Sequence, residues 1–306
     1  MKPIRGWLLA RFVVLAVSIS FSVSLARGSS PQKLTFERDD FVWVANIDGS
    51  SAKKIAAGQC PDLSPDGTRL AYITYDPAKQ LGPAKIAVAD LGTGTTTVLK
   101  DIPSDRCSTT CWSPDGKQLL VQFIVDSDSH LGLVNADGTG FRNVRDTSLG
   151  NQDFWSVAWA PDGQSIFTQD MENVYRLDLN GKVLKKWVIE KLVPGGSMSS
   201  DIRLDCSPDG KTLLMDVEMD ENSREGWDGP PPAIWTLDLA TDKATRLTPK
   251  SLYGWESHWL DAPDSILFIS IRAGEKDTAI YRMSVSGKGA DKKLLVKNAR
   301  YPGTSL

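Results

Sequence analysis

The chain has 306 residues, with 35 lysine and arginine residues against 38 aspartate and glutamate residues, a formal net charge of −3. A charge this small, without a basic stripe, argues against nucleic acid as a partner. The chain contains four cysteines and two histidines. They form no CxxC pair and no histidine cluster, so the sequence implies neither a metal site nor a cofactor.

The N-terminal segment has the features of an export signal. Basic residues up to Arg11 precede an apolar run, Phe12–Leu25, and Ser24 and Ala26 supply small residues at the −3 and −1 positions of a cleavage site. The alternative is a membrane anchor, but the run is shorter than the roughly 20 residues that span a bilayer. We therefore expect a signal peptide over residues 1–26, a periplasmic or secreted protein, and no stable membrane insertion after cleavage.

A four-residue motif recurs along the rest of the chain. Its five copies are Ser64–Gly67, Ser113–Gly116, Ala160–Gly163, Ser207–Gly210 and Ala262–Ser265. The prolines are 49, 47, 47 and 55 residues apart, a spacing typical of repeat architectures. Proline fixes φ, aspartate bonds to its own backbone and glycine accepts positive φ, so each copy predicts a tight turn.

Two series of apolar runs accompany these turns. One follows the turns directly, at Leu70–Ile73, Leu119–Val121, Ile166–Phe167, Leu213–Met215 and Ile266–Ile269. The other interleaves with it, at Val42–Ala45, Ile86–Ala89, Leu131–Val134, Val174–Leu177, Ile234–Leu237 and Ile280–Met283. Short apolar runs between turn signals predict strands. Each repeat is therefore expected to form four antiparallel strands, A to D, with no helix.

A large residue or a cysteine lies two places ahead of the motif's proline in four copies, as Leu63, Trp112, Trp159 and Cys206. In the fifth copy Trp259 lies four places ahead, which we interpret as an insertion of two residues. Trp112 and Trp159 occupy equivalent repeat positions, so both are expected to be structural.

The repeats predict an all-β, six-bladed β-propeller of four-stranded antiparallel blades, because stacking repeats around an axis buries their faces and leaves only short edges. Five full repeats are accompanied by one extra C–D pair near the N-terminus. Leu34–Glu37 resembles a strand B, and Ala299–Leu306 resembles a strand A without its turn. The ring is therefore expected to close with a composite blade from both termini, and residues 27–306 to form a single domain.

These turns, the tryptophans ahead of them and the aromatic C strands resemble the WD-type repeats of the TolB family. The resemblance covers about residues 33–306. It implies the propeller fold. The expected partner is an envelope protein, peptide or glycan. The chain has no room for the separate N-terminal α/β domain of TolB, so the resemblance concerns the propeller part alone. Metal-dependent lyases that act on pectate fragments and have related propellers use a histidine-rich central site. The two histidines of this chain do not supply such a site.

The sequence leaves two alternatives for disulfide pairing among Cys60, Cys107 and Cys111. Cys107 and Cys111 could meet through a turn, or Cys107 could meet Cys60 from the neighbouring blade. Cys206 occupies the tryptophan position of its repeat and is expected to be a buried free thiol.

The D–A and B–C connections of a propeller open on one face, and this chain places its extra length there. The longest insertion is Glu218–Pro232, an acidic segment with three consecutive prolines. We expect this loop-rich face to hold the ligand. The candidate ligand-face residues are Trp155, Trp227, Tyr253, Trp255, Glu218 and Asp220. The alternative for Trp155 and Trp255 is packing between blades.

The favoured hypothesis is therefore a secreted or periplasmic binding module without catalytic activity. The alternative is a lyase or hydrolase acting on polysaccharide fragments at the mouth of the central channel. That enzyme would use His130 or His258 with carboxylates such as Asp128 and Asp201. Convergence of both histidines with two or more carboxylates would distinguish the two hypotheses.

Overall fold

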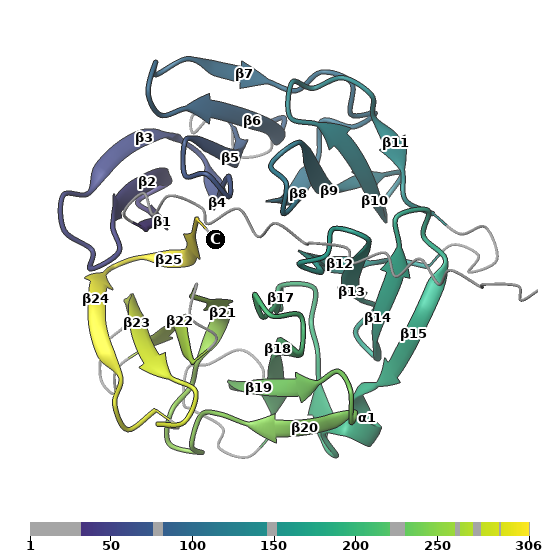
Figure 1. Ribbon diagram of the computed structural model, residues 1–306, viewed down its shortest axis with the longest axis vertical. Coiled ribbons are helices and arrows are strands. Elements are labelled where there is room, and N and C mark those ends of the chain that lie inside the picture. Colours follow the sequence, from purple (N-terminus) through teal and green to yellow (C-terminus); the bar gives the residue numbers. More distant parts are fainter. Residues whose placement is uncertain are drawn as a thin grey trace, which may run out of the picture.

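The computed structural model describes residues 32–75, 82–145, 152–220, 230–260, 264–271, 277–287 and 289–305, and the structural findings concern these residues. The predicted signal peptide, residues 1–26, lies outside them. Six antiparallel sheets surround a central axis as the blades of a propeller (Figure 1). The predicted fold class is therefore confirmed. No helix among the described residues is long and apolar enough to cross a membrane.

The first three blades contain the N-terminal half of the chain and its last strand. Blade 1 consists of β25 (Arg300–Thr304), β1 (Lys33–Arg38), β2 (Phe41–Asn46) and β3 (Lys53–Ala57). Blade 2 consists of β4 (Gln59–Leu63), β5 (Arg69–Thr74), β6 (Lys85–Asp90) and β7 (Thr96–Val98). Blade 3 consists of β8 (Cys107–Trp112), β9 (Gln118–Val125), β10 (Asp128–Asn135) and β11 (Arg142–Asn143).

The other three blades follow in chain order. Blade 4 consists of β12 (Trp155–Trp159), β13 (Ser165–Gln169), β14 (Asn173–Asp178) and β15 (Val183–Val188). Blade 5 consists of β17 (Leu204–Cys206), β18 (Thr212–Met219), β19 (Pro232–Asp238) and β20 (Lys243–Arg246). Blade 6 consists of β21 (Trp255–Trp259), β22 (Ser265–Ile271), β23 (Thr278–Ser284) and β24 (Lys293–Lys297).

The connection between blades 4 and 5 contains two elements that the repeat pattern did not predict. One is a single helical turn, α1 (Ile189–Leu192). The other is β16 (Gly196–Ser197), which pairs with the outer end of β18. β18 is eight residues long and reaches past β17, which leaves an edge for β16 to cover.

The composite blade closes the ring as predicted. β25 pairs antiparallel with β1, with Leu34 opposite Thr304 and Thr35 opposite Gly303. Blade 5 also holds this strand, because the Arg203 guanidinium donates to the carbonyl oxygen of Pro302 at 2.6 Å. The last strand of the chain is thereby fixed on two sides.

The hydrophobic core is divided into six clusters, each between two neighbouring blades. Ile86 of blade 2 packs in one cluster with Phe123 of blade 3, and Phe167 of blade 4 shares another with Met215 of blade 5. A blade therefore buries its apolar faces only when both neighbours are present.

The repeated turns owe their regularity to the serine as well as to proline, aspartate and glycine. In the first turn, Ser64 Oγ donates to Asp66 Oδ1 at 2.6 Å and accepts from the Arg69 N–H at 2.9 Å. Gly67 has φ +66°, the left-handed region that favours glycine. The same contacts recur at Ser113 and Ser207.

The predicted two-residue insertion in the fifth repeat is wrong. Trp259 pairs with Ile266, the same seven-residue interval that separates Leu63 from its partner Leu70. The hairpin therefore has the standard length. The Pro-Asp pair of this copy comes two positions later in the sequence than in the other repeats, and residues 261–263 lie outside the described part of the chain.

Trp112 and Trp159 join neighbouring blades. The Trp112 indole donates to the Asp62 carbonyl oxygen at 3.1 Å, and its backbone N–H donates to Asp62 Oδ2 at 2.8 Å. The Trp159 indole donates in the same way to the Cys111 carbonyl oxygen at 3.3 Å. Both side chains are buried, as a structural role requires.

Replacing Trp112 with alanine should lower the free energy of unfolding by about 3–5 kcal/mol, because a large buried side chain is lost. Trp112→Phe should cost less, since it removes the indole N–H but keeps most of the volume. Leu184→Ala is the control, because Leu184 is 52% exposed on an outer strand. Chemical denaturation measures all three, and a cost for Trp112→Ala no larger than that of Leu184→Ala would contradict the structural assignment.

Removing residues 299–306 should destabilise the whole ring, because it unpairs β1 and exposes an inner sheet edge. Removing residues 305–306 alone leaves β25 in place and should have a small effect. The melting temperatures of the two truncated proteins test this difference. Equal melting temperatures would show that β25 does not close the ring.

Candidate functional site

The innermost strands of the six blades surround the central axis (Figure 1). A cavity of about 610 Å³ opens at the end that carries the Pro-Asp-Gly turns, and we name it the turn-side cavity. A smaller cavity of about 140 Å³ lies at the opposite end, where the D–A connections enter, and we name it the loop-side cavity. Asp62, Cys111, Val157 and Arg203 line both cavities and separate them.

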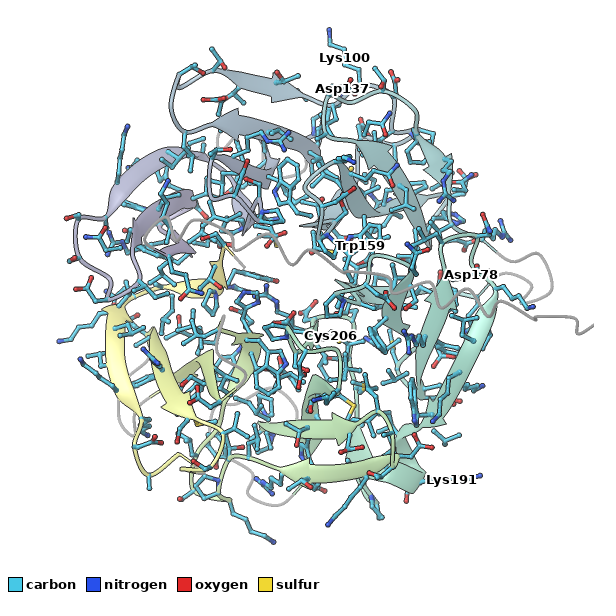
Figure 2. The ribbon with its side chains drawn as sticks, viewed as in Figure 1. Lys100, Asp137, Trp159, Asp178, Lys191 and Cys206 are labelled. Carbon is cyan, nitrogen blue, oxygen red and sulfur yellow. The ribbon has the colours of Figure 1, made fainter. Side chains whose placement is uncertain are left out.

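The turn-side cavity combines a proline rim with a polar floor. The rim includes the turn prolines Pro65, Pro114, Pro161 and Pro208. Asp62, Arg203, Asp205 and His258 line its deeper part. In Figure 2, Trp159 and Cys206, two lining residues, lie near the axis, whereas Lys100, Asp137 and Lys191 lie at the outside of the ring.

His258 is a structural link between β21 and β25. Its Nε2 accepts a hydrogen bond from the Thr304 backbone N–H at 3.1 Å, so the neutral ring carries its proton on Nδ1. Nδ1 lies 2.9 Å from Asp205 Oδ2, to which it donates. Both ring nitrogens are thus engaged within the protein. The enzyme hypothesis combined this histidine with Asp128 or Asp201, but the carboxylate that it contacts is Asp205.

Arg203 is the cation of the channel. One of its nitrogens donates to the Pro302 carbonyl oxygen, and the other terminal nitrogen lies 3.3 Å from His258 Nδ1. Asp205, two residues further along, accepts from the Trp259 backbone N–H at 2.7 Å. These polar groups connect blades 5, 6 and 1 around the axis.

Several carboxyl groups near the axis are withdrawn from water. Burial raises the pKa of Asp62 and of Asp216 to about 6 and the pKa of Glu256 to about 7. Glu256 is 2% exposed, pairs with Arg300 at 3.3 Å and accepts from the Tyr301 backbone N–H. These contacts hold β25 against β21.

All four cysteines are free thiols, so neither of the pairings considered for Cys107 is present. Cys206 is buried, as predicted. Cys111 is half-buried and lines both cavities, and desolvation of its thiol raises the pKa well above the ordinary value. The thiol therefore stays protonated at neutral pH and is a poor nucleophile.

The candidate ligand-face residues have different surroundings in the structure. Trp155 is half-buried and lines the loop-side cavity, whereas Trp255 packs against the core cluster between blades 6 and 1. Tyr253 is half-buried in the connection before β21, and Asp220 is exposed at the end of β18. Glu218 accepts from Ser197 Oγ at 3.4 Å. Trp227 lies outside the described residues.

The residues of the enzyme hypothesis do not converge. His130 and Asp128 lie on β10, and His130 is not part of the lining of either cavity; its ring contacts Phe123 instead. His258 lines the turn-side cavity, and Asp201 lines the loop-side cavity. Within the described ranges, no group of three or more His, Cys, Asp or Glu side chains could hold a metal ion.

Sequence reasoning missed Asp62, Arg203 and Asp205 as channel residues. Asp62 and Asp205 were detectable by reading the same position in each repeat, whereas Arg203 lies two residues before that position. The position two residues ahead of the motif serine is occupied by Asp62, Cys111, Ala158 and Asp205, and its equivalent on β21 is His258. All but Ala158 are polar or carry a thiol, on a strand that the fold places at the axis.

Glu256 should make stability depend on pH in a defined direction. The pKa of Glu256 is raised in the folded protein. Its contribution to the free energy of unfolding is therefore fully present below the unfolded pKa of 4.5 and is lost as pH rises through about 7. The stability of the wild type relative to Glu256→Gln should therefore fall between pH 5 and pH 8. Thermal denaturation of both proteins at each pH measures this difference.

Asp137→Asn is the matched control for that experiment. Asp137 lies in an exposed turn, and the Thr139 N–H lowers its pKa below 3.8, so it titrates outside this window. Its stability difference from the wild type should not change between pH 5 and pH 8. A Glu256→Gln difference that is equally flat would contradict the assignment.

Comparison with solved structures places this fold among known propellers. TolB from Acinetobacter baumannii is 18% identical, with a TM-score of 0.70; the match covers 90% of this chain and 66% of that chain, slightly under two thirds of its length. A putative TolB from Agrobacterium tumefaciens is also 18% identical, with a TM-score of 0.60, covering 88% and 90% of the two chains. An oligogalacturonate lyase in complex with manganese is 15% identical, with a TM-score of 0.56, covering 84% and 70%.

At these identities the likeness concerns the fold. The sequence itself carries the family assignment, because the family model of the TolB beta propeller domain matches residues 37–227. The match begins within β1 and extends past β18, and so it spans most of the ring whose turns, cross-blade tryptophans and composite closure are described above. The chain belongs to the TolB beta propeller domain family.

Proposed function

We propose that this protein is a non-catalytic binding module of the cell envelope, periplasmic or secreted, which holds a segment of an envelope protein in the turn-side cavity. Family membership supports the envelope location and the kind of partner. The expected signal peptide supports export.

The observation that carries this proposal is the state of the polar groups in the channel. The ring nitrogens of His258 are both engaged, Asp62 and Asp205 each accept a backbone N–H of the next blade, and the Cys111 thiol is protonated. These groups hold the ring together. Proton transfer or nucleophilic attack requires a group that is free to reach the substrate, so the arrangement favours binding over catalysis.

The shape of the turn-side cavity favours a polypeptide segment. Its volume of about 610 Å³ falls in the range of ligand sites, roughly 300–1,000 Å³. Its rim consists of prolines on turns that serine–aspartate hydrogen bonds fix in three of the four copies. Little conformational entropy is lost when such a rim binds. Trp112 and Trp159 add aromatic surface beside the polar floor.

The loop-rich face remains a second candidate surface, for a protein, peptide or glycan. Trp155 and Asp220 are accessible there, and Tyr253 lies at the same end of the molecule. The polysaccharide-cleaving alternative has no comparable support, because its proposed histidines and carboxylates lie in separate places.

Site-specific photo-crosslinking in cells tests the proposal. Gln164 lines the turn-side cavity and is exposed, so p-benzoylphenylalanine at this position should give a discrete crosslinked adduct. The control position is Leu184, which is exposed on the outer strand of the same blade. A third position, Asp201, reports on the loop-rich face.

An adduct at Gln164 that mass spectrometry assigns to an envelope protein, with none at Leu184, is the expected result. Adducts at Asp201 alone would place the partner on the loop-rich face and contradict the turn-side assignment. Identical adducts at Gln164 and Leu184 would show that the crosslinks arise from random collisions with the outer surface, and would contradict binding in the turn-side cavity.

A further inference from the structure

The loop-side cavity is a second concave site, separate from the one proposed for a polypeptide. Its walls come from five of the six blades: β4, β8 and β12, the connection before β17, and β25. Its volume of about 140 Å³ suits one small chemical group rather than a chain segment. The polypeptide proposal makes no use of it.

One hydroxyl group in this cavity lacks a partner. Ser108 Oγ is fully buried and makes no hydrogen bond within the described part of the chain. The hydroxyls around it differ, since Ser156 Oγ accepts from the Leu204 N–H at 2.9 Å and Thr110 Oγ1 donates to the Leu120 carbonyl oxygen at 3.2 Å. A buried hydroxyl without a partner is unfavourable, and a ligand that bonds to it relieves this cost.

Trp155 gives the cavity an aromatic wall that the core does not use. Trp255, at the equivalent position of blade 6, packs against a core cluster. Trp155 is half-buried, lines the loop-side cavity and belongs to none of the six clusters of the described residues. A tryptophan at the wall of a cavity offers an apolar face together with an N–H donor.

The cavity lining contains two carboxyl groups, Asp62 and Asp201, and one guanidinium, Arg203. Asp201 is exposed at its mouth, and Arg203 lies at the wall shared with the turn-side cavity. A carboxylate accepts hydrogen bonds and a guanidinium donates them, so together they can bind groups that do both. Hydroxyl groups have this property, and Thr109 adds another hydroxyl to the wall.

We propose that the loop-side cavity binds one ring of a neutral carbohydrate. The apolar face of the sugar would lie on Trp155, and its hydroxyls would bond to Ser108, Asp201 and Arg203. The ligand would be the terminal sugar of an envelope glycan. This binding is independent of the polypeptide partner in the turn-side cavity.

Titration of the full chain with glucose, galactose, N-acetylglucosamine and galacturonic acid tests the proposal. Saturation-transfer NMR detects binding, and intrinsic tryptophan fluorescence gives the affinity. At least one neutral sugar should bind, and Trp155→Ala should abolish its binding. Trp43→Ala is the matched control, because Trp43 is half-buried on β2 and is not part of the cavity lining.

Ser108→Ala separates a binding role from a structural one. It removes a hydroxyl that makes no internal hydrogen bond, so stability should be unchanged or higher, while sugar affinity should fall about tenfold. The proposal is overturned if no neutral sugar binds at tens of millimolar, or if only galacturonic acid binds. It is also overturned if affinity survives both Trp155→Ala and Ser108→Ala, or if Ser108→Ala unfolds the protein. The crosslink at Gln164 should not respond to sugar, so each proposal can fail alone.

Discussion

The pairing of β25 with β1 is the contact on which the rest of the molecule depends. Every apolar cluster lies between two blades, so an open ring would expose the faces of blades 1 and 6 and leave two sheet edges unpaired. Contacts at the junction join residues as far apart in sequence as Gln32 and Ser305, 273 positions. Contacts of such high sequence separation form late and slow folding.

The first role of the polar residues at the axis is to stabilise this closure of the ring. His258 and Glu256 reach β25 from the neighbouring blade 6, and Arg203 reaches it from blade 5. Side chains of these types in a central channel would ordinarily indicate catalysis. Here each makes a hydrogen bond that orients a strand. The groups proposed for ligands are the prolines and aromatic faces at one end and, at the other end, Trp155, Ser108, Asp201 and the remaining N–H groups of Arg203.

The fold was predictable from the sequence because turn chemistry is local. Proline, aspartate and glycine act within four residues, and their recurrence fixed the number of hairpins and the composite blade. The same locality caused the error at Trp259, because the position of Pro263 does not by itself determine the length of a hairpin. Register depends on pairing with Ile266, which a turn motif does not encode.

The candidate site was less predictable for a different physical reason. Asp62, Arg203 and His258 come from three blades. Their proximity depends on the radius of the ring and on the bulges in the inner strands β4 and β21. Trp155 and Trp255 occupy equivalent positions but have different surroundings. Repeat position thus identifies which residues face the axis, while the neighbouring blade determines what each one contacts.

The buried thiols have a consequence for the chemistry of the protein in an oxidising environment. Burial raises the pKa of Cys60 and Cys206 to about 12 and that of Cys107 to about 11. At pH 7, only about one in 10,000 thiols with a pKa near 11 is ionised to the reactive thiolate. Oxidation and disulfide exchange are therefore suppressed while the ring is closed. The rate at which these thiols are modified therefore reports the rate of ring opening, because only an opened molecule exposes them to solvent.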